Sequence, residues 1–408
     1  MKVALGYNIQ EGPWGGANLF AKSLYEYLIE QGEEVVFSLD DFDIDLILLT
    51  EPRRNLLSGA FSDYDVLDYL ENINSEAVVI QRINDCDQRK EINHMNRRYI
   101  WANRCADYTV FIGEWLVPLY EKSGWVKRDY DIGLNGADQK VFYAKDSYNR
   151  DKGDKLKIIT HHWGPNWLKG WDFYEYLDRL LDNEEWSQKF TFTYAGKLPK
   201  GFTFRNSVYK EPLSGDALAN VIRDHDIYLT ASQFEPAGMH HIEGAMCGLP
   251  LIYRDSGALP EYCKNHGVMF QDEKSFKDAL LSVRQNYDSF SSNMRSYPHS
   301  GERMCRKYHK IFKEVYLQRD ALLQKRDSRK FSNYIPFRGN VRIDIGTVEN
   351  FLFNCTPTTD LDSLFLLKSF YVLESLTDRS FEQQKMKICF SLLSSFNIEG
   401  SNADEFGS

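Results

Sequence analysis

Two glutamates with seven residues between them, Glu235 and Glu243, lie in the stretch EPAGMHHIE. Pro236 suits the first position of a helix, and the carboxylate of Glu235 just before it suits the positive end of the helix dipole. On an unbroken helix Glu243 follows about 12 Å along the axis, about the span from a hexose to the ribose of a nucleotide-sugar. The first N–H groups of this helix would point at a ligand between the carboxylates; they belong to Ala237, Gly238 and Met239. The alternative is a helix cap at Glu235 and a surface residue at Glu243.

A glycine-rich turn, GPWGGAN, directly follows the first expected strand and opens the first expected helix. Gly15 and Gly16 allow the backbone to come close to a ligand, and the unpaired N–H groups at the helix start attract an anion. The spacing differs from the GxGxxG pattern of dinucleotide-binding folds, which weakens a nicotinamide interpretation. The alternative is a turn that only packs the helix on the strand.

A third stretch, HHWGPNWLKGWDF, follows the first expected strand of the second half of the chain. Lys169 lies at the start of a helix and would place one ammonium where a diphosphate needs a positive charge. His161 and His162 can donate hydrogen bonds to a phosphate or a sugar, and two adjacent histidines with no third ligand nearby are a weak metal pattern. The alternative for Lys169 is a solvated surface charge.

Acidic residues in DDFDID, at residues 40–45, resemble metal ligands but introduce the expected strand DLILLT. We therefore interpret this run as a solvated turn and expect no metal site.

The composition is that of a folded protein of roughly two to three domains, with 408 residues of which 43% are hydrophobic. The net charge of -10 argues against a nucleic-acid partner, because no dense Lys/Arg face offsets it. Seven scattered cysteines without a CxxC pair suit a reducing compartment. The first residues lack the pattern of a signal peptide, and no apolar run approaches the ~18 residues of a transmembrane helix. We expect a cytoplasmic protein.

Apolar runs alternate with amphipathic stretches in residues 1–138 and again in residues 156–326, and a polar linker at 139–155 separates the two series. Strands separated by helices predict an α/β protein with two Rossmann-like, doubly wound parallel sheets and a ligand cleft between them. The helical run 301–326 is expected to close the second unit. Residues 331–408 predict a small helical appendage or an oligomerisation surface, to which we assign no chemistry.

Together these stretches resemble the family 4 retaining glycosyltransferases of the GT-B fold. EPAGMHHIE is similar to the E-x7-E motif of that family, and further matches follow in register along residues 1–325: the early Gly-Gly turn, NGAD before the linker, LKG at the start of a helix, AGK at the end of a strand, and GLPLIYRDSGALPE after the motif.

The resemblance implies a role for each matching residue. Glu235 would hold hydroxyls of the donor sugar, and Glu243 would hold the ribose. Gly15, Gly16 and Lys169 would bind the diphosphate, with His161 and His162 beside it. Tyr209 and Lys210 would lie near the nucleotide base. An arginine that the family places shortly before the lysine is missing from THHWGPN, so that a histidine or Trp163 would take over part of its role.

The loop QRINDCDQRK, at residues 81–90, follows a strand that should end at the cleft. Family members often carry a histidine near this point, and this chain offers Arg82, Asn84 and Asp85, which we interpret as acceptor-binding residues. The alternative is a polar loop with a capping aspartate.

The resemblance implies a metal-independent transfer of sugar from a nucleotide-sugar, such as a UDP- or GDP-sugar, to an acceptor hydroxyl of a glycan, lipid or protein, with retention of configuration and no cofactor. Glu235 and Lys169 would be the catalytic residues. Two alternatives stay open, namely a GT-B epimerase, hydrolase or phosphorylase, and a non-catalytic sugar-binding scaffold.

Overall fold

The computed structural model describes residues 1–12, 15–53, 57–145 and 155–327. Its first sheet has six parallel strands in the order β2-β1-β3-β4-β5-β6. These strands are β1 (Lys2–Leu5), β2 (Glu34–Val36), β3 (Leu46–Leu49), β4 (Val78–Ile83), β5 (Tyr108–Phe111) and β6 (Tyr130–Ile132). All residues of β3 and β4 are buried, as expected for parallel strands that helices cover on both faces.

The helices of this half are α1 (Gly16–Glu30), α2 (Asp63–Asn72), α3 (Met95–Ala102) and α4 (Leu116–Lys122), with short 3-10 turns η1 (Gln88–Lys90) and η2 (Asn103–Cys105). A capping box at Ser62 and Asp65 fixes the start of α2. Each helix connects two parallel strands, which is the alternation that the sequence predicts.

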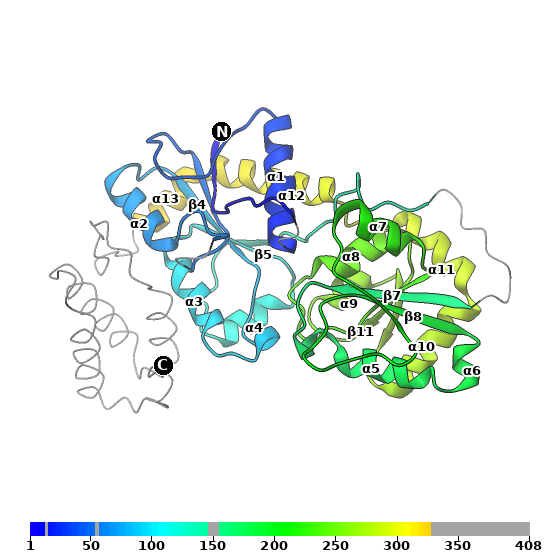
Figure 1. The fold of residues 1–408 in the computed structure, drawn as a ribbon. Helices are drawn as coiled ribbons and strands as arrows, with labels where there is room; N and C mark the ends of the chain where they lie inside the picture. The colour runs from blue at the N-terminus through cyan, green and yellow to red at the C-terminus, as the bar shows by residue number, and fades with distance from the viewer. Residues whose placement is uncertain (13–14, 54–56, 146–154, 328–408) are drawn as a thin grey trace, which may run out of the picture.

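The second sheet also has six parallel strands, in the order β12-β11-β10-β7-β8-β9. These are β7 (Leu156–His162), β8 (Phe190–Gly196), β9 (Val208–Lys210), β10 (Ile227–Thr230), β11 (Leu251–Arg254) and β12 (Gly267–Phe270). The predicted fold class, two doubly wound parallel sheets, is therefore confirmed (Figure 1).

The helices of the second half are α5 (Trp171–Leu180), α6 (Glu184–Ser187), α7 (Gly215–Arg223), α8 (Met239–Met246), α9 (Leu259–Cys263), α10 (Glu273–Gln285) and α11 (Tyr287–Asn293), with 3-10 turns η3 (Trp167–Lys169) and η4 (Met294–Ser296). An aromatic core lies under α5, where Trp171 and Tyr174 pack with Tyr194 and Phe192. This core holds the start of α5, and with it η3, against the sheet.

The last two described helices, α12 (Gly301–Leu317) and α13 (Arg319–Asp327), return to the first sheet (Figure 1). The sequence placed the run 301–326 with the second unit instead. The apolar face of α12 packs with residues of α1 and of strands β1, β3 and β4 in one core cluster; its members on α12 are Met304, Cys305, Tyr308, Ile311, Phe312 and Val315. The N-terminal half of the chain is thus completed by residues from the far end.

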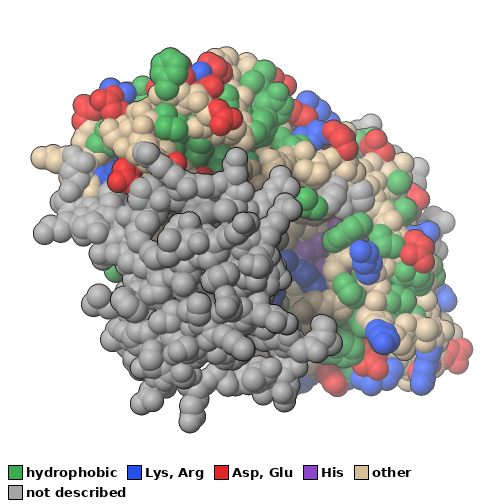
Figure 2. Space-filling model, turned by 60° about the vertical axis from the view of Figure 1, so that its left-hand side comes forward, with side chains coloured by type: hydrophobic (Ala, Val, Ile, Leu, Met, Phe, Trp, Pro, Cys, Tyr) green, Lys and Arg blue, Asp and Glu red, His purple; other side chains and the backbone are tan. Residues whose placement is uncertain are grey.

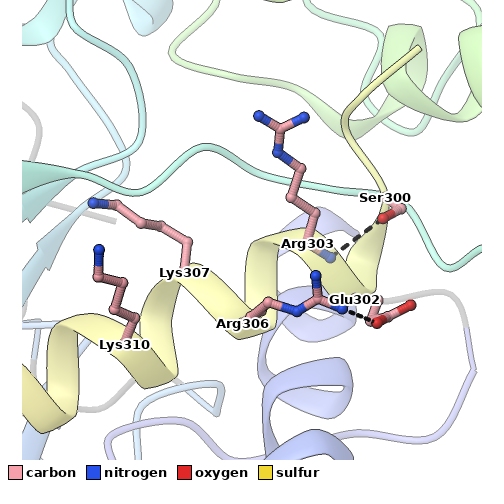
Figure 3. A pocket seen from close by; sticks show the side chains of 6 residues that line it. All are labelled: Ser300, Glu302, Arg303, Arg306, Lys307 and Lys310. Carbon is pink, nitrogen blue, oxygen red and sulfur yellow. Dashed lines mark hydrogen bonds and ion pairs between the residues drawn. The ribbon is translucent and has the colours of Figure 1, made fainter. Parts of the chain in front are cut away.

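The chain crosses between the two sheets twice, and the two crossings touch. Ala137 N donates to His299 O at 3.2 Å, and a Cβ at Gly136 would lie 2.1 Å from Ser300 O. Beside the crossing, one face of α12 borders a shallow hollow of about 450 Å³, as Figure 3 shows. It is lined by Ser300, Glu302, Arg303, Arg306, Lys307 and Lys310, none of which the sequence named as a site residue.

The two sheets face each other through a shared apolar cluster that contains Phe111 and Leu116 from the first half and Met239 and Leu259 from the second. Tyr262 joins them as well, because its hydroxyl donates to Ile112 O at 2.8 Å. This packing fixes the loops at the ends of the strands opposite one another.

Two predictions from the sequence are not tested here. The appendage at 331–408 and most of the expected linker, residues 146–154, lie outside the described residues. In the part of the chain that the structure describes, no helix has the length and apolar character needed to cross a membrane.

Candidate functional site

The segment with the two glutamates begins as an irregular loop, and α8 starts only at Met239, with Gly238 as its N-cap. The prediction of a helix that starts at Pro236 is therefore wrong. Phe234 adopts φ 50°, and its N–H donates to Ser256 Oγ at 2.8 Å. Ala258 N donates to Glu235 O at 2.9 Å, so the loop before α9 holds the backbone of Glu235 in place.

Glu235 lies in the core of this site, with 2% of its surface exposed. Its carboxylate accepts from Lys169 Nζ at 2.6 Å and gives α8 no side-chain cap. Burial alone would raise the pKa of this carboxyl, but Lys169 and Arg89 outweigh burial and hold the pKa below its usual value. Glu235 is therefore an ionised, buried carboxylate, and the helix-cap alternative does not apply.

Glu243 is also buried, and its carboxylate accepts from His161 Nε2 at 2.7 Å. A carboxylate can only accept, so Nε2 carries a proton, and Nδ1 of the same ring lies 3.0 Å from the Tyr228 hydroxyl. The alternative of a surface position for Glu243 is therefore wrong. A chain of hydrogen bonds from Tyr228 through His161 orients this second carboxylate.

Lys169 is the last residue of η3, directly before α5. Asn166 caps this turn by accepting from Leu168 N at 2.8 Å. Gly170 has φ 102°, and a Cβ there would lie 2.6 Å from the backbone of Ala231. The turn therefore packs against the end of β10, which places the Lys169 ammonium at Glu235.

Three further histidines near the site belong to the core. His162 is buried and its Nε2 lies 2.7 Å from the Tyr174 hydroxyl; burial lowers its pKa far below the usual value. Nε2 of His240 lies 2.7 Å from Thr230 Oγ1. Both ring nitrogens of His241 lack a hydrogen-bond partner among the described residues, and burial lowers its pKa to about 3. The expected contact of His162 with the donor is not supported by this position.

The glycine turn of the first half reaches the second half. Gly15 has φ 79° and caps α1, and a Cβ on Gly16 would lie 2.5 Å from Met239 Cγ. Asn18 ties the turn together, because its side chain accepts from Gln10 N and donates to Gln10 O, both at 2.8 Å. The turn and the start of α8 therefore adjoin, as a shared ligand site requires.

Only part of the expected acceptor loop is available to a ligand. Arg82 is buried, stacks over the Phe20 ring at 3.7 Å and donates to Asn135 Oδ1 at 2.8 Å. Asn135 in turn donates to Ala237 O at 2.8 Å, so Arg82 supports the loop before α8 instead of facing the cleft. Asn84 accepts from the Tyr99 hydroxyl at 2.7 Å.

Asp85, the third expected acceptor residue, accepts from Lys90 Nζ at 2.6 Å and lies 3.5 Å from Arg89 Nη1. Arg89 and Lys90 were missed in the sequence. Their signal is the basic pair RK shortly after the loop's two aspartates.

Tyr209 and Lys210 lie on β9, at the exposed edge of the second sheet. Tyr209 pairs with Tyr194, which pairs with Thr160 next to His161. Two strand spacings separate β9 from β7, about 10 Å, which is within the reach of a nucleotide. Their contact with a base stays a prediction.

The acidic run at 40–45 surrounds a lysine. Lys2 Nζ lies 3.0 Å from Asp41 and 2.7 Å from Asp43. Among the described residues, no group of three or more His, Cys, Asp or Glu side chains could hold a metal ion. These contacts explain the run as a satisfied surface turn.

A test of this geometry is available at Gly257, which has φ 59° and whose ideal Cβ would lie 2.5 Å from both N and O of Glu235. Gly257→Ala is expected to lower the free energy of unfolding by about 2–4 kcal/mol, because strain of a left-handed residue adds to overpacking. Gly215→Ala is the control, since Gly215 has φ 55° with open space around it. Urea unfolding of both variants isolates the contact with Glu235; equal losses would contradict it.

Comparisons with known proteins agree with this arrangement. Residues 182–286, which include both glutamates, match the model of a family described as glycosyl transferases group 1. No curated protein matches the sequence.

Solved structures with a similar fold include a sucrose-phosphate synthase from Thermosynechococcus elongatus (11% identity, TM-score 0.53, 78% of this chain and 99% of that one). Another is HepE from Anabaena in complex with UDP (12%, TM-score 0.56, 77% and 99%). A third is the catalytic domain of starch synthase IV from Arabidopsis thaliana bound to ADP and acarbose (14%, TM-score 0.50, 74% and 78%). At these identities the similarity shows the fold, and the expected GT-B architecture is confirmed.

Proposed function

We propose that this protein is a retaining glycosyltransferase that moves a sugar from a nucleotide-sugar to an acceptor hydroxyl without a metal ion. The observation that carries the proposal is the pair Glu235 and Glu243: both are buried, both are held by a basic side chain, and both lie on the segment that faces the first half of the chain. Figure 2 shows histidine side chains beside Lys or Arg side chains in a hollow of the molecular surface.

Each group has a chemical task in this proposal. Glu235 accepts hydrogen bonds from hydroxyls of the donor sugar, and Glu243 accepts them from the ribose. Lys169 and the backbone N–H groups at Gly15 and Gly16 stabilise the negative charge that develops on the leaving diphosphate. The diphosphate then takes the proton of the acceptor hydroxyl on the same face of the sugar, which gives retention.

The family match over residues 182–286 supports this function, since it covers the whole segment that carries the glutamates. HepE was solved with UDP and starch synthase IV with ADP, so the fold accommodates different bases. The base and sugar used by this chain, the acceptor and the cytoplasmic location stay predictions.

A thermal-shift panel tests the proposal, with UDP, GDP, ADP and TDP measured in EDTA and again with Mg²⁺. One of them is expected to raise the melting temperature in EDTA, because a ligand at 100 times its Kd adds about 2.7 kcal/mol to the free energy of unfolding. The matching nucleoside without phosphates is the control and should give a much smaller shift.

No shift with any nucleotide would contradict the proposal, and a shift only with Mg²⁺ would contradict metal independence. Turnover of the matching nucleotide-sugar then separates the functions. Hydrolysis that no acceptor accelerates would indicate a hydrolase or epimerase, and binding without turnover a scaffold.

A further inference from the structure

Five charged side chains from both halves of the chain lie near one another: Asp85, Arg89 and Lys90 from the first half, and Lys169 and Glu235 from the second. Lys169 pairs with Glu235 at 2.6 Å, and their side chains are 16% and 3% exposed. Across the interface Asp85, with 8% exposed, pairs with Lys90 and Arg89.

A direct contact joins the loop of Asp85 to the loop of Glu235. Cys86 Sγ, next to Asp85 in the chain, lies 3.9 Å from Phe234 O, next to Glu235. The loop that carries Arg89 and Lys90 is therefore seated on the loop that carries Glu235. The electrostatics agree: burial raises the pKa of Glu235, and Arg89 is, after Lys169, one of the charges that lower it.

Besides Lys169, the wall formed by the second half has Lys197 directly after β8, and the ammonium of Lys197 lies over the Trp163 ring at 4.4 Å from its centre. Lys169 supplies one ammonium and already shares it with Glu235. The stretch between β7 and Lys169, residues 163–168, contains no arginine and no other lysine. A diphosphate carries at least two negative charges and loses much of its hydration in a cleft, so the shared ammonium of Lys169 alone leaves it poorly compensated.

The first half supplies further positive charge for the diphosphate. The side chains of Arg89 and Lys90 are each about one third exposed, whereas Arg82 on the preceding strand is buried and committed to Asn135. Asp85 holds both cations in position. The three cations Arg89, Lys90 and Lys169 outnumber the two carboxylates of Asp85 and Glu235, which leaves one net positive charge in this group.

We propose that Arg89 and Lys90 complete the diphosphate site from the opposite side of the cleft. This inference rests on the proposed function. The diphosphate of the donor then binds between Lys169 on one wall and Arg89 and Lys90 on the other. Lys169 turns from Glu235 to the diphosphate, so that the carboxylate of Glu235 becomes available to the sugar. The nucleotide thereby bridges the two halves of the chain.

The experiment uses calorimetry with the nucleoside diphosphate found in the panel and no acceptor. Arg89→Gln and Lys90→Gln are each expected to weaken binding about tenfold or more, since a charge-assisted hydrogen bond is lost. The loss for the corresponding nucleoside monophosphate should be much smaller, and Arg89→Lys should recover part of the affinity. Arg179→Gln, on the exposed face of α5, is the matched control and should bind as the wild type.

The outcomes separate the two proposals. If the wild type binds no nucleoside diphosphate, the proposed function fails and this inference with it. If Lys169→Ala weakens binding while the folded Arg89→Gln and Lys90→Gln variants bind normally, only this inference is overturned. A loss confined to the acceptor's KM in these variants would also overturn it and would assign the two cations to an anionic acceptor. Melting temperatures near that of the wild type confirm that the variants are folded.

Discussion

Replacing Arg326 with methionine is expected to lower the free energy of unfolding by about 3–5 kcal/mol, because it leaves a buried carboxylate without its guanidinium. Arg326 and Asp107 are 5% and 0% exposed. The guanidinium also donates to Ser75 O at 2.8 Å and to Ala77 O at 2.7 Å. Arg326 therefore fastens α13 to the segments that lead into β4 and β5 of the first sheet, and its loss removes charge compensation and two hydrogen bonds together.

Its neighbour Lys325 is the control. Lys325 pairs with Asp129 at 2.6 Å, but both side chains are more than half exposed, so Lys325→Met should cost less than about 1 kcal/mol. Urea unfolding of the two variants under the same conditions gives both values. Small and equal losses would mean that α13 does not dock on the first sheet as described.

This return of α12 and α13 shows what the sequence could not give. The spacing of Met304, Tyr308, Ile311 and Val315 predicts a helix with one apolar face, and that helix is present. Periodicity says which face is buried but not what covers it. Position in the chain favoured the nearer sheet, whereas the face packs on α1 and the first sheet, about 280 residues earlier.

The site was predictable to the extent that it follows local rules. Alternation of strands and helices placed the ends of β7 and β10 at the cleft. The motif EPAGMHHIE pointed to Glu235 and Glu243, and the separate stretch HHWGPNWLKGWDF pointed to Lys169. Strand geometry alone distinguishes the two histidines of β7, because adjacent side chains point to opposite faces: His161 reaches Glu243, and His162 enters the core.

The remaining site features depend on contacts between distant residues. Lys169 and Glu235 are 66 residues apart, and no local pattern predicts that they pair. The start of α8 shifted from Pro236 to Met239 because tertiary contacts at Phe234 and Gly257 favour an extended loop over another helical turn. Arg89 and Lys90 were missed because only the folded chain places them opposite Lys169 and Glu235, which come from the second half.

Glu235→Gln is expected to reduce turnover by roughly 10- to 150-fold, because a neutral amide replaces the carboxylate that holds the donor sugar, and one charge-assisted hydrogen bond contributes about 1.5–3 kcal/mol. Nucleoside diphosphate alone should bind at least as well as to the wild type. Lys169 pairs with Glu235, so the substitution releases its ammonium for the phosphate.

Glu243→Gln should fail differently, since its carboxylate, held by His161, is assigned to the ribose that nucleotide and nucleotide-sugar share. Both ligands should lose affinity by a similar factor of about ten.

Calorimetry with each ligand, alongside turnover, measures the two patterns, and Glu175→Gln on the exposed surface of α5 is the control. Because both glutamates are buried and hydrogen-bonded, each variant is first compared with the wild type by melting temperature. If folded Glu235→Gln and Glu243→Gln gave equal and small effects, the seven-residue spacing would be a consequence of packing. The two carboxylates would then serve the core of the second half, and the transfer of a sugar would lose its main structural support.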